Sequence, residues 1–462
     1  MHFYESMQIF GAVFGMPEFI VNCGTEDSYL LYGDEKYVIS VKNARADAPF
    51  AGDESDKNVL KRYLYKVLSE IYGYKSPWGC MTGVRPAKIL HTLYMKGMTR
   101  DDARQWFRDF YLMSETKINL CFETFENQRK FLYENETKKC GFYVGIPFCP
   151  TICTYCTFGS SPLSRYKKRV DEYLDALTEE ISVTVDALTK ENYEIESLYI
   201  GGGTPTSLNE AQLERLLRVV TEKIDVSKLD EFSVEAGRPD TITPEKLDVI
   251  KKYGATRISI NPQSMNENTL RRVGRSHSPE DVKEIFAYAR EKHFENINMD
   301  IIAGLPGEHL TDFLNTVDEI TGLGPECITV HTLSLKRASE LTRNESEHDD
   351  LAAFETEDMT RLAYEKITSC GLRPFYMYRQ KNCIGNNENV CYCIPGNESP
   401  YNVHIMEEDM TIFACGAGAV TKVVTGGNIN RFFNMKSVEE YISRFENELL
   451  KKQDFIEETA RV

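Results

Sequence analysis

Between residues 142 and 333 the chain alternates short apolar runs with longer segments whose apolar residues recur at helical spacing. The short runs are rich in Val, Ile, Leu, Phe and Tyr and predict strands at Phe142–Phe148, Ser197–Ile200, Glu231–Glu235, Arg257–Asn261, Asn296–Ile302 and Cys327–Leu333. The longer segments predict helices at Lys168–Thr189, Glu210–Ile224, Pro244–Tyr253, Pro279–Lys292 and Thr311–Leu323.

This alternation predicts an α/β fold with a parallel sheet, because strands separated by helices of this length form right-handed βαβ units. The number of units predicts a partial (β/α)6 barrel, open on one side, with its chemistry at the carboxyl ends of the strands. A doubly wound open sheet is the alternative that the pattern alone allows.

The flanking segments have a different pattern. Residues 1–138 combine strand-like runs at 28–32 and 36–41 with helical spacing at Asp56–Tyr72, Thr99–Tyr111 and Ser114–Glu134, and Pro86 suits the first turn of a further helix. Beyond residue 345 the pattern predicts helices at Leu351–Cys370 and Lys436–Lys452 and a strand at Met410–Cys415. We therefore expect an N-terminal α+β domain (1–138), the barrel (139–345) and a C-terminal α+β extension (346–462).

Composition limits the classes of protein that this chain can represent. Of its 462 residues 42% are hydrophobic and 27% charged, which is typical of a soluble globular protein. No apolar run has the length of a membrane span and the N-terminus does not resemble a signal peptide, so we expect a cytoplasmic protein. The net charge of −17 argues against nucleic acid as the main partner. The 13 cysteines should then be reduced thiols or metal ligands rather than disulfides.

Three of these cysteines, Cys149, Cys153 and Cys156, stand in a C-x3-C-x2-C spacing directly after the first predicted strand. Structural zinc sites use four ligands in pairs, and ferredoxin clusters use four cysteines. A loop with three thiolates suits a [4Fe–4S] cluster that keeps one iron open for a non-protein ligand. A structural zinc knuckle and chance clustering in a chain with many cysteines are the alternatives.

Glycines and carboxylates stand where the following strands end. Gly201-Gly-Gly-Thr-Pro-Thr206 follows the second strand, and glycines there allow the backbone to approach a ligand closely. Glu235 ends the third strand and Asp300 lies inside the fifth. A carboxylate within an apolar strand is costly unless it is paired, so we expect Asp300 to bind a partner.

Together these motifs resemble the radical S-adenosylmethionine (SAM) enzymes, and among them the HemN-like branch of oxygen-independent coproporphyrinogen III dehydrogenases. The resemblance rests on Tyr143–Cys149, Gly201–Thr206, Ser233–Ala236, Ser259–Asn266, Leu270–His277 and Asn298–Gly307. It favours the barrel, implies that the C-terminal extension covers the substrate, and implies a [4Fe–4S] cluster on the three cysteines, which cleaves SAM to a 5′-deoxyadenosyl radical. It also implies SAM or cluster contacts for Tyr143, Tyr155, Phe158, Gly202, Gly203, Thr204, Glu235, Gln263, Arg275 and Asp300.

The chain departs from the branch at three places. Gly145 stands where the branch has His, and Phe158 stands where HemN-type enzymes have a fourth cysteine. Phe at this position resembles the haem chaperone HemW, but the His-Asn motif of the chaperones is absent; its approximate place is taken by Glu388–Cys393. The segments Gly83–Lys88, Tyr378–Asn382 and Glu388–Cys393, with the long N-terminal region, most resemble the HemZ-type coproporphyrinogen dehydrogenases.

The resemblance implies oxidative decarboxylation of coproporphyrinogen III propionates to vinyl groups, with a small reductant such as flavodoxin or ferredoxin. Haem binding or delivery, and radical chemistry on another tetrapyrrole, are the alternatives. The substrate's propionates require cations, for which Arg85, Lys88, Arg379 and Lys381 are candidates; the alternative is that these side chains are solvated surface cations. Cys383, Cys391 and Cys393 are either ligands of a second cluster or metal, or free thiols.

Overall fold

The computed structural model of the protein describes residues 20–23, 28–32, 35–52, 54–133, 138–156, 161–334, 353–380 and 383–460. Its centre is an 11-stranded mixed sheet in the order β12-β13-β11-β10-β9-β8-β7-β4-β14-β15-β16. The strands from β11 to β14 in this order run parallel to one another. They are β4 (Lys139–Ile146), β7 (Glu194–Gly202), β8 (Glu231–Gly237), β9 (Arg257–Ile260), β10 (Ile297–Ala303), β11 (Cys327–Thr332) and β14 (Thr411–Cys415).

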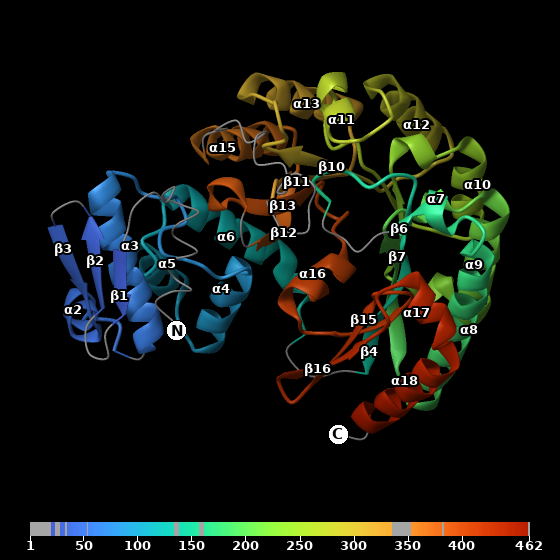
Figure 1. Ribbon diagram of the computed structural model, residues 1–462, viewed down its shortest axis with the longest axis horizontal. Helices are drawn as coiled ribbons and strands as arrows, with labels where there is room; N and C mark the ends of the chain where they lie inside the picture. The colour runs from blue at the N-terminus through green and yellow to red at the C-terminus, as the bar shows by residue number, and fades with distance from the viewer. Residues whose placement is uncertain are drawn as a thin grey trace.

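The partial barrel predicted from the sequence is confirmed, with strands at all six predicted places. Helices lie between successive strands and cover the outer face of the curved sheet (Figure 1). They are α8 (Val170–Lys190), α9 (Glu210–Lys223), α10 (Pro244–Lys252), α12 (Pro279–Glu291) and α13 (Leu310–Leu323), with short α7 (Leu163–Tyr166) and α11 (Glu267–Arg272). Asn209 and Ser278 begin α9 and α12 with capping boxes, which satisfy backbone donors at both helix starts.

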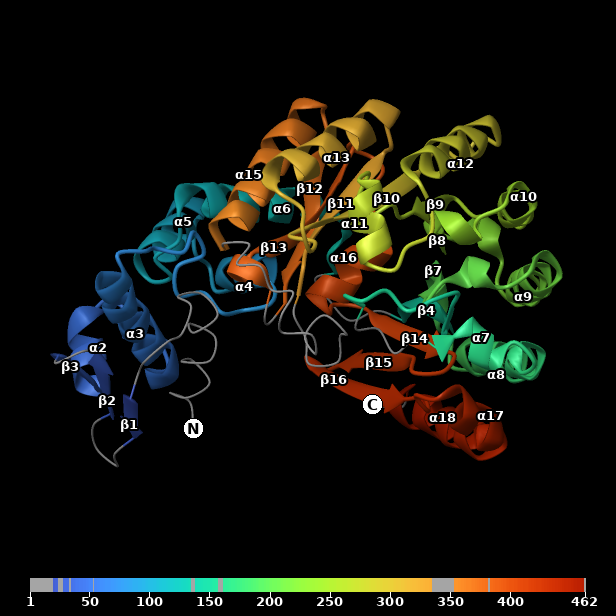
Figure 2. The same cartoon turned by 45° about the horizontal axis from the view of Figure 1, so that its top comes forward.

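Residues after 353 extend this sheet at both edges. The antiparallel strands β13 (Glu388–Cys393) and β12 (Arg373–Arg379) continue it beyond β11, while β15 (Val420–Thr425) and β16 (Asn428–Phe433) continue it beyond β14. The helix α15 (Ala353–Ser369) precedes β12, and α16 (Pro400–Glu407) lies inside the curve of the sheet (Figure 2).

The last helix predicted from the sequence is two helices in the structure, α17 (Val438–Ser443) and α18 (Phe445–Ala460). The chain turns at Arg444, and both helices contact α8. Val438 and Tyr441 are buried on α17, and Ile456 is buried on α18.

The N-terminal part has a small antiparallel sheet, β1 (Ile20–Cys23), β2 (Ser28–Tyr32) and β3 (Glu35–Ile39), and a group of helices. The helices are α2 (Val41–Asp47), α3 (Asp56–Tyr72), α4 (Pro86–Met95), α5 (Arg100–Asp109) and α6 (Glu115–Gln128). The predicted strand at 36–41 ends early because the Ser40 hydroxyl accepts from Asn43 N–H and begins α2. The helix α6 packs against β12 at the edge of the main sheet.

Alternation along the strands decides which residues face the inside of the barrel. Thr329 and His331 on β11, Ser259 on β9 and Glu235 on β8 all line the interior cavity. None of the helices among the described residues has the length and apolar character needed to cross a lipid bilayer.

Candidate functional site

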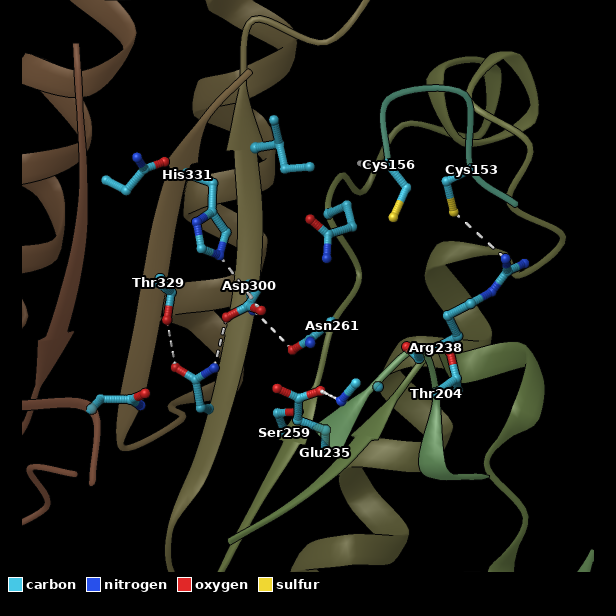
Figure 3. A pocket seen from close by; sticks show the side chains of 18 of the residues that line it. Cys153, Cys156, Thr204, Glu235, Arg238, Ser259, Asn261, Asp300, Thr329 and His331 are labelled. Atoms are coloured by element: carbon cyan, nitrogen blue, oxygen red, sulfur yellow. Dashed lines mark hydrogen bonds and ion pairs between the residues drawn. The ribbon is translucent and has the colours of Figure 1, made fainter. Parts of the chain in front are cut away.

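A cavity of about 510 Å³ opens at the carboxyl ends of the barrel strands. Its wall is formed by residues of the cysteine loop, of β4 and β7 to β13, and of α16. Cys153 and Cys156 lie on one side of it, with Asp300 and His331 opposite and Glu235 between them (Figure 3). The cavity is therefore where the parallel-barrel pattern predicts chemistry.

The three cysteines of the C-x3-C-x2-C loop all line this cavity. Cys149 ends the short strand β5 (Phe148–Cys149), which pairs with β6 (Ser161–Pro162), and its sulfur lies 3.4 Å from Thr204 Oγ1. Arg238 Nη1 lies 3.5 Å from Cys153 Sγ, and this positive charge stabilises a thiolate. Thr154 N–H donates to Val273 O at 3.2 Å, which fastens the loop to the end of α11.

Gly202 and Gly203 bring the backbone after β7 against the cysteine loop. Gly202 has φ +114°, and a Cβ there would lie 2.8 Å from Ile146 O. A Cβ on Gly203 would lie 2.7 Å from Phe148 O and 3.0 Å from Cys149 Sγ. Only glycine permits this approach, so the need for these two glycines is steric.

Glu235 lies between the glycine turn and a tyrosine. Tyr199 Oη donates to Glu235 Oε1 at 2.6 Å, and Gly202 N–H donates to Oε2 at 3.3 Å. Burial raises the pKa of Glu235 to about 7 and nearby Asp300 adds to this, although the two hydrogen bonds oppose the shift. A cationic group in the cavity would hold this carboxylate ionised.

Asp300 keeps its charge by a different arrangement on β10. Asn298 Nδ2 donates to Asp300 Oδ1 at 2.7 Å, and His331 Nε2 lies 3.6 Å from Oδ2. Burial alone would raise the pKa of Asp300, but the approach of His331, followed by the hydrogen bond from Asn298, lowers it overall. On the other side of the imidazole, Tyr378 Oη lies 3.3 Å from His331 Nδ1.

Arg275 and Gln263 complete the wall after β9. Arg275 donates to Tyr155 Oη from Nε and Nη2 at 3.2 and 3.1 Å, and to Asn261 O at 2.7 Å. Gln263 has φ +70°, and its buried Oε1, like the buried Ser259 Oγ, has no hydrogen-bond partner within the described part of the chain. Such buried polar atoms, which line the cavity, are partners for a ligand with hydroxyl and amine groups.

The structure thus brings most of the predicted cofactor residues to one cavity: Tyr143, Tyr155, Gly202, Gly203, Thr204, Glu235, Gln263, Arg275 and Asp300. Their individual ligand roles stay predictions. Phe158 and Lys381 lie outside the described residues.

The other predicted substrate residues do not line the cavity as the structure describes it. Arg85 pairs with Glu408, and Lys88 Nζ lies 2.5 Å from Glu407 O. Arg379 is buried, donates to Met81 O at 2.6 Å and Asn386 O at 2.9 Å, and lies over the Trp78 ring. These contacts give the three cations partners within the protein, and their role in binding substrate stays a prediction.

The cysteines after residue 380 separate into two places. Cys391 and Cys393 on β13 pair in register with Thr329 and Cys327 on β11 and are buried below the cavity wall. Cys383 lies apart, with its sulfur 3.7 Å from Thr332 O. Within the described ranges, no three His, Cys, Asp or Glu side chains converge as they would on a single metal ion.

Sequence reasoning did not single out Arg238, Tyr199, His331 or Tyr378 as site residues. Arg238, Tyr199 and His331 are at or near the carboxyl ends of β8, β7 and β11, a position that could have marked them. Tyr378 belongs to β12, whose antiparallel place in the sheet the sequence did not reveal.

The residues present fit a cubane cluster with SAM. Three thiols, the glycines that leave room beside Cys149, and the buried polar atoms of Gln263 and Ser259 share one cavity. In such a cluster each thiolate binds a different iron, so the ligands do not converge on one point.

Comparison with known proteins identifies the family. Residues 143–320 match the Radical SAM superfamily. The chain is 37% identical to the oxygen-independent coproporphyrinogen-III oxidase-like protein HemZ of Bacillus subtilis, over 95% of this chain and 94% of that protein. It is 31% identical to the heme chaperone HemW of the same organism, over 68% of this chain and 81% of that protein.

A solved structure with a similar fold is coproporphyrinogen III oxidase (HemN) from Escherichia coli, with a TM-score of 0.55 and 23% identity, covering 69% of this chain and 72% of that chain. The family match and the similarity to HemZ over nearly the whole chain show that the chain belongs to the radical SAM superfamily. Within the superfamily its relatives are those of the HemN/HemW-like branch, whose names refer to coproporphyrinogen oxidation and to haem.

Proposed function

We propose that the protein decarboxylates propionate side chains of coproporphyrinogen III to vinyl groups without oxygen, using a [4Fe–4S] cluster and SAM. The observation that carries this proposal is the shared cavity of Cys149, Cys153 and Cys156 with Glu235 and Asp300. The similarity to HemZ over nearly the whole chain supports the tetrapyrrole as substrate.

In this proposal Cys149, Cys153 and Cys156 hold the cluster. When bound, the cluster and SAM supply the one-electron chemistry that removes a hydrogen atom from the propionate carbon next to the ring. The propionate then loses carbon dioxide and passes one electron to an external one-electron acceptor, and its two remaining carbons become the vinyl group. A small reductant protein such as flavodoxin or ferredoxin supplies the electron that begins each cycle.

The protein's own residues bind and orient the reactants. Glu235 accepts hydrogen bonds from an amine, with Tyr199 and Gly202 N–H holding its carboxylate in place. Asp300 accepts from ribose hydroxyls, and the unpaired Gln263 Oε1 offers a further acceptor. Residues of α16 contribute to the wall and help to exclude water from the reaction.

The test is an anaerobic assay of the cluster-loaded protein with SAM, a reductant and coproporphyrinogen III. We expect 5′-deoxyadenosine, carbon dioxide and protoporphyrinogen IX in proportion. Formation of 5′-deoxyadenosine without carbon dioxide would contradict the proposed substrate and favour another tetrapyrrole.

The second candidate is a haem-handling protein, favoured by the 31% identity to HemW. It predicts tight haem binding with no decarboxylation in the same assay. Both candidates use the same cluster, so the presence of the cluster does not distinguish them. The products formed from coproporphyrinogen do.

The pKa of Glu235 gives a prediction for SAM binding. Since this pKa is raised to about 7, the carboxyl is increasingly protonated below pH 7 and loses the negative charge that attracts positively charged SAM. We expect SAM affinity to fall by up to about tenfold per pH unit below that value. Equilibrium binding of SAM to the cluster-loaded protein across this range measures the effect.

Glu235→Gln should bind SAM more weakly and lose the part of the pH dependence that Glu235 causes. Glu214→Gln, in an exposed ion pair with Lys252, is the matched control and should keep the wild-type profile. A Glu235→Gln profile that matches the wild type would show that another group binds the amine.

A further inference from the structure

Three side chains from three strands form a line at the end of the cavity opposite the cysteines. Asp300 comes from β10, His331 from β11 and Tyr378 from β12, and all three line the cavity. His331 Nε2 lies 3.6 Å from Asp300 Oδ2, and Tyr378 Oη lies 3.3 Å from His331 Nδ1. Figure 3 shows His331 pointing toward Asp300. The imidazole therefore connects a carboxylate to a phenol.

The arrangement follows from the order of the strands. Asp300 pairs in register with Thr329, two residues before His331, and Tyr378 pairs with Asn389 on β13. Because β13 lies between β11 and β12, Tyr378 approaches His331 across one intervening strand. The side chains of Asp300 and His331 remain 20% and 26% exposed, so a ligand in the cavity has access to them.

The three arginines in the described wall of the cavity already form hydrogen bonds or ion pairs with other groups of the protein. Arg238 pairs with Asp240, and Arg275 binds Tyr155 and Asn261 O. The guanidinium of Arg257 donates to Asn296 Oδ1 at 2.9 Å, Asn397 O at 3.0 Å and Cys327 Sγ at 3.2 Å. An anionic ligand at this end of the cavity therefore meets Tyr378 and His331 as hydrogen-bond donors, and not a guanidinium that is free of other partners.

The state of His331 decides which way the phenol hydrogen points. With Nε2–H directed to Asp300, a neutral ring accepts from Tyr378 O–H through Nδ1. A protonated ring donates from Nδ1 to the phenol oxygen, which frees the O–H for a carboxylate in the cavity. Burial raises the pKa of Tyr378 above its usual value, so the phenol keeps its hydrogen.

We propose that Tyr378 donates a hydrogen bond to a propionate of the bound tetrapyrrole, and that His331 is the positioning residue that links this contact to Asp300. The proposal rests on the proposed function for the identity of the ligand. Since Asp300 is also the residue proposed for the ribose of SAM, the line couples the two binding events. Occupation of Asp300 by SAM orders His331, and a ring that carries a hydrogen on both nitrogens then holds the phenol with its O–H free for the propionate.

The first test is equilibrium binding of coproporphyrin III, the oxidised ring with the same four propionates, to the cluster-loaded protein. We expect Tyr378→Phe to weaken porphyrin binding about tenfold, the loss typical of one hydrogen bond to a charged group, and to leave SAM affinity unchanged. Tyr94→Phe removes a phenol from α4, outside the lining of the cavity, and should bind both ligands as the wild type does.

The second test measures coupling. In the wild type, SAM should tighten porphyrin binding by about fivefold or more. His331→Gln should bring this factor close to one, because an amide does not connect Asp300 and Tyr378 as the ring does. The double variant His331→Gln with Tyr378→Phe should bind porphyrin as tightly as whichever single variant binds it less tightly, since both substitutions act through one contact.

Each outcome decides the proposal. The proposal would be overturned if Tyr378→Phe bound coproporphyrin as tightly as the wild type, or if SAM still tightened porphyrin binding in His331→Gln. It would also be overturned if the wild type did not bind coproporphyrin. The failure of the proposed function is a separate result: a wild type that binds coproporphyrin with the expected variant effects but releases no carbon dioxide would overturn the decarboxylation and leave the propionate contact standing.

Discussion

Cys153→Ala is expected to lose its iron–sulfur cluster and, with it, all SAM cleavage. The thiol lines the cavity beside Arg238, and the cluster would depend on it for one of three protein ligands. Loss of a ligand should lower metal affinity and activity by more than the roughly 100-fold that follows when a residue hydrogen-bonded to a ligand is changed. Iron content and 5′-deoxyadenosine formation after anaerobic reconstitution measure the result.

The fold should survive this change, because Cys153 lies in a loop and not in a strand. Cys370→Ala removes an exposed thiol after α15 and is the matched control, with full iron and full SAM cleavage expected. A Cys153→Ala protein that keeps its iron and cleaves SAM would show that this loop does not hold the cluster.

The barrel could be predicted because its strands are buried on both faces. Strands such as Lys139–Ile146 contain nearly continuous apolar residues, and amphipathic helices separate the strands along the chain. The edge strand β12 was not predicted, since Tyr376 and Tyr378 turn polar groups into the cavity and Arg379 is buried against carbonyl oxygens. Such a strand has no simple apolar pattern.

The parts of the site that depend on the spacing of residues within one segment could be predicted. The parts that depend on the order of strands in the sheet could not. The three cysteines and the glycine turn are short motifs, and the structure brings both to one cavity. The meeting of Asp300 with His331 and Tyr378 depends on β13 entering between β11 and β12. No pattern within one segment contains that information. The same holds for Arg238, which reaches Cys153 across 85 residues of sequence.

Glu388→Gln is expected to destabilise the contact between the N-terminal helices and the sheet by about 3–5 kcal/mol, the usual cost of breaking a buried ion pair. Lys117 Nζ on α6 lies 2.5 Å from Glu388 Oε1, and both side chains are at most 5% exposed. Trp78 Nε1 donates to the other carboxylate oxygen at 2.7 Å. Burial raises the pKa of Glu388, but Lys117 and Trp78 more than compensate and lower it, so the carboxylate is charged.

The substitution isolates the charge, because glutamine still offers an oxygen to Trp78. It leaves Lys117 buried without its counter-ion, and it removes the negative charge that also stabilises the buried guanidinium of Arg379. The chain's two tryptophans, Trp78 and Trp106, both belong to the N-terminal part. Their fluorescence during urea unfolding therefore reports on this region.

Two further variants make the interpretation specific. Lys117→Met combined with Glu388→Gln should recover most of the loss, because the unpaired ammonium is gone. Glu214→Gln, in its exposed ion pair with Lys252, should unfold as the wild type does. If Glu388→Gln unfolds at the wild-type urea concentration, the buried pair does not stabilise this contact, and the packing of α6 against β12 must hold the N-terminal helices to the sheet without it.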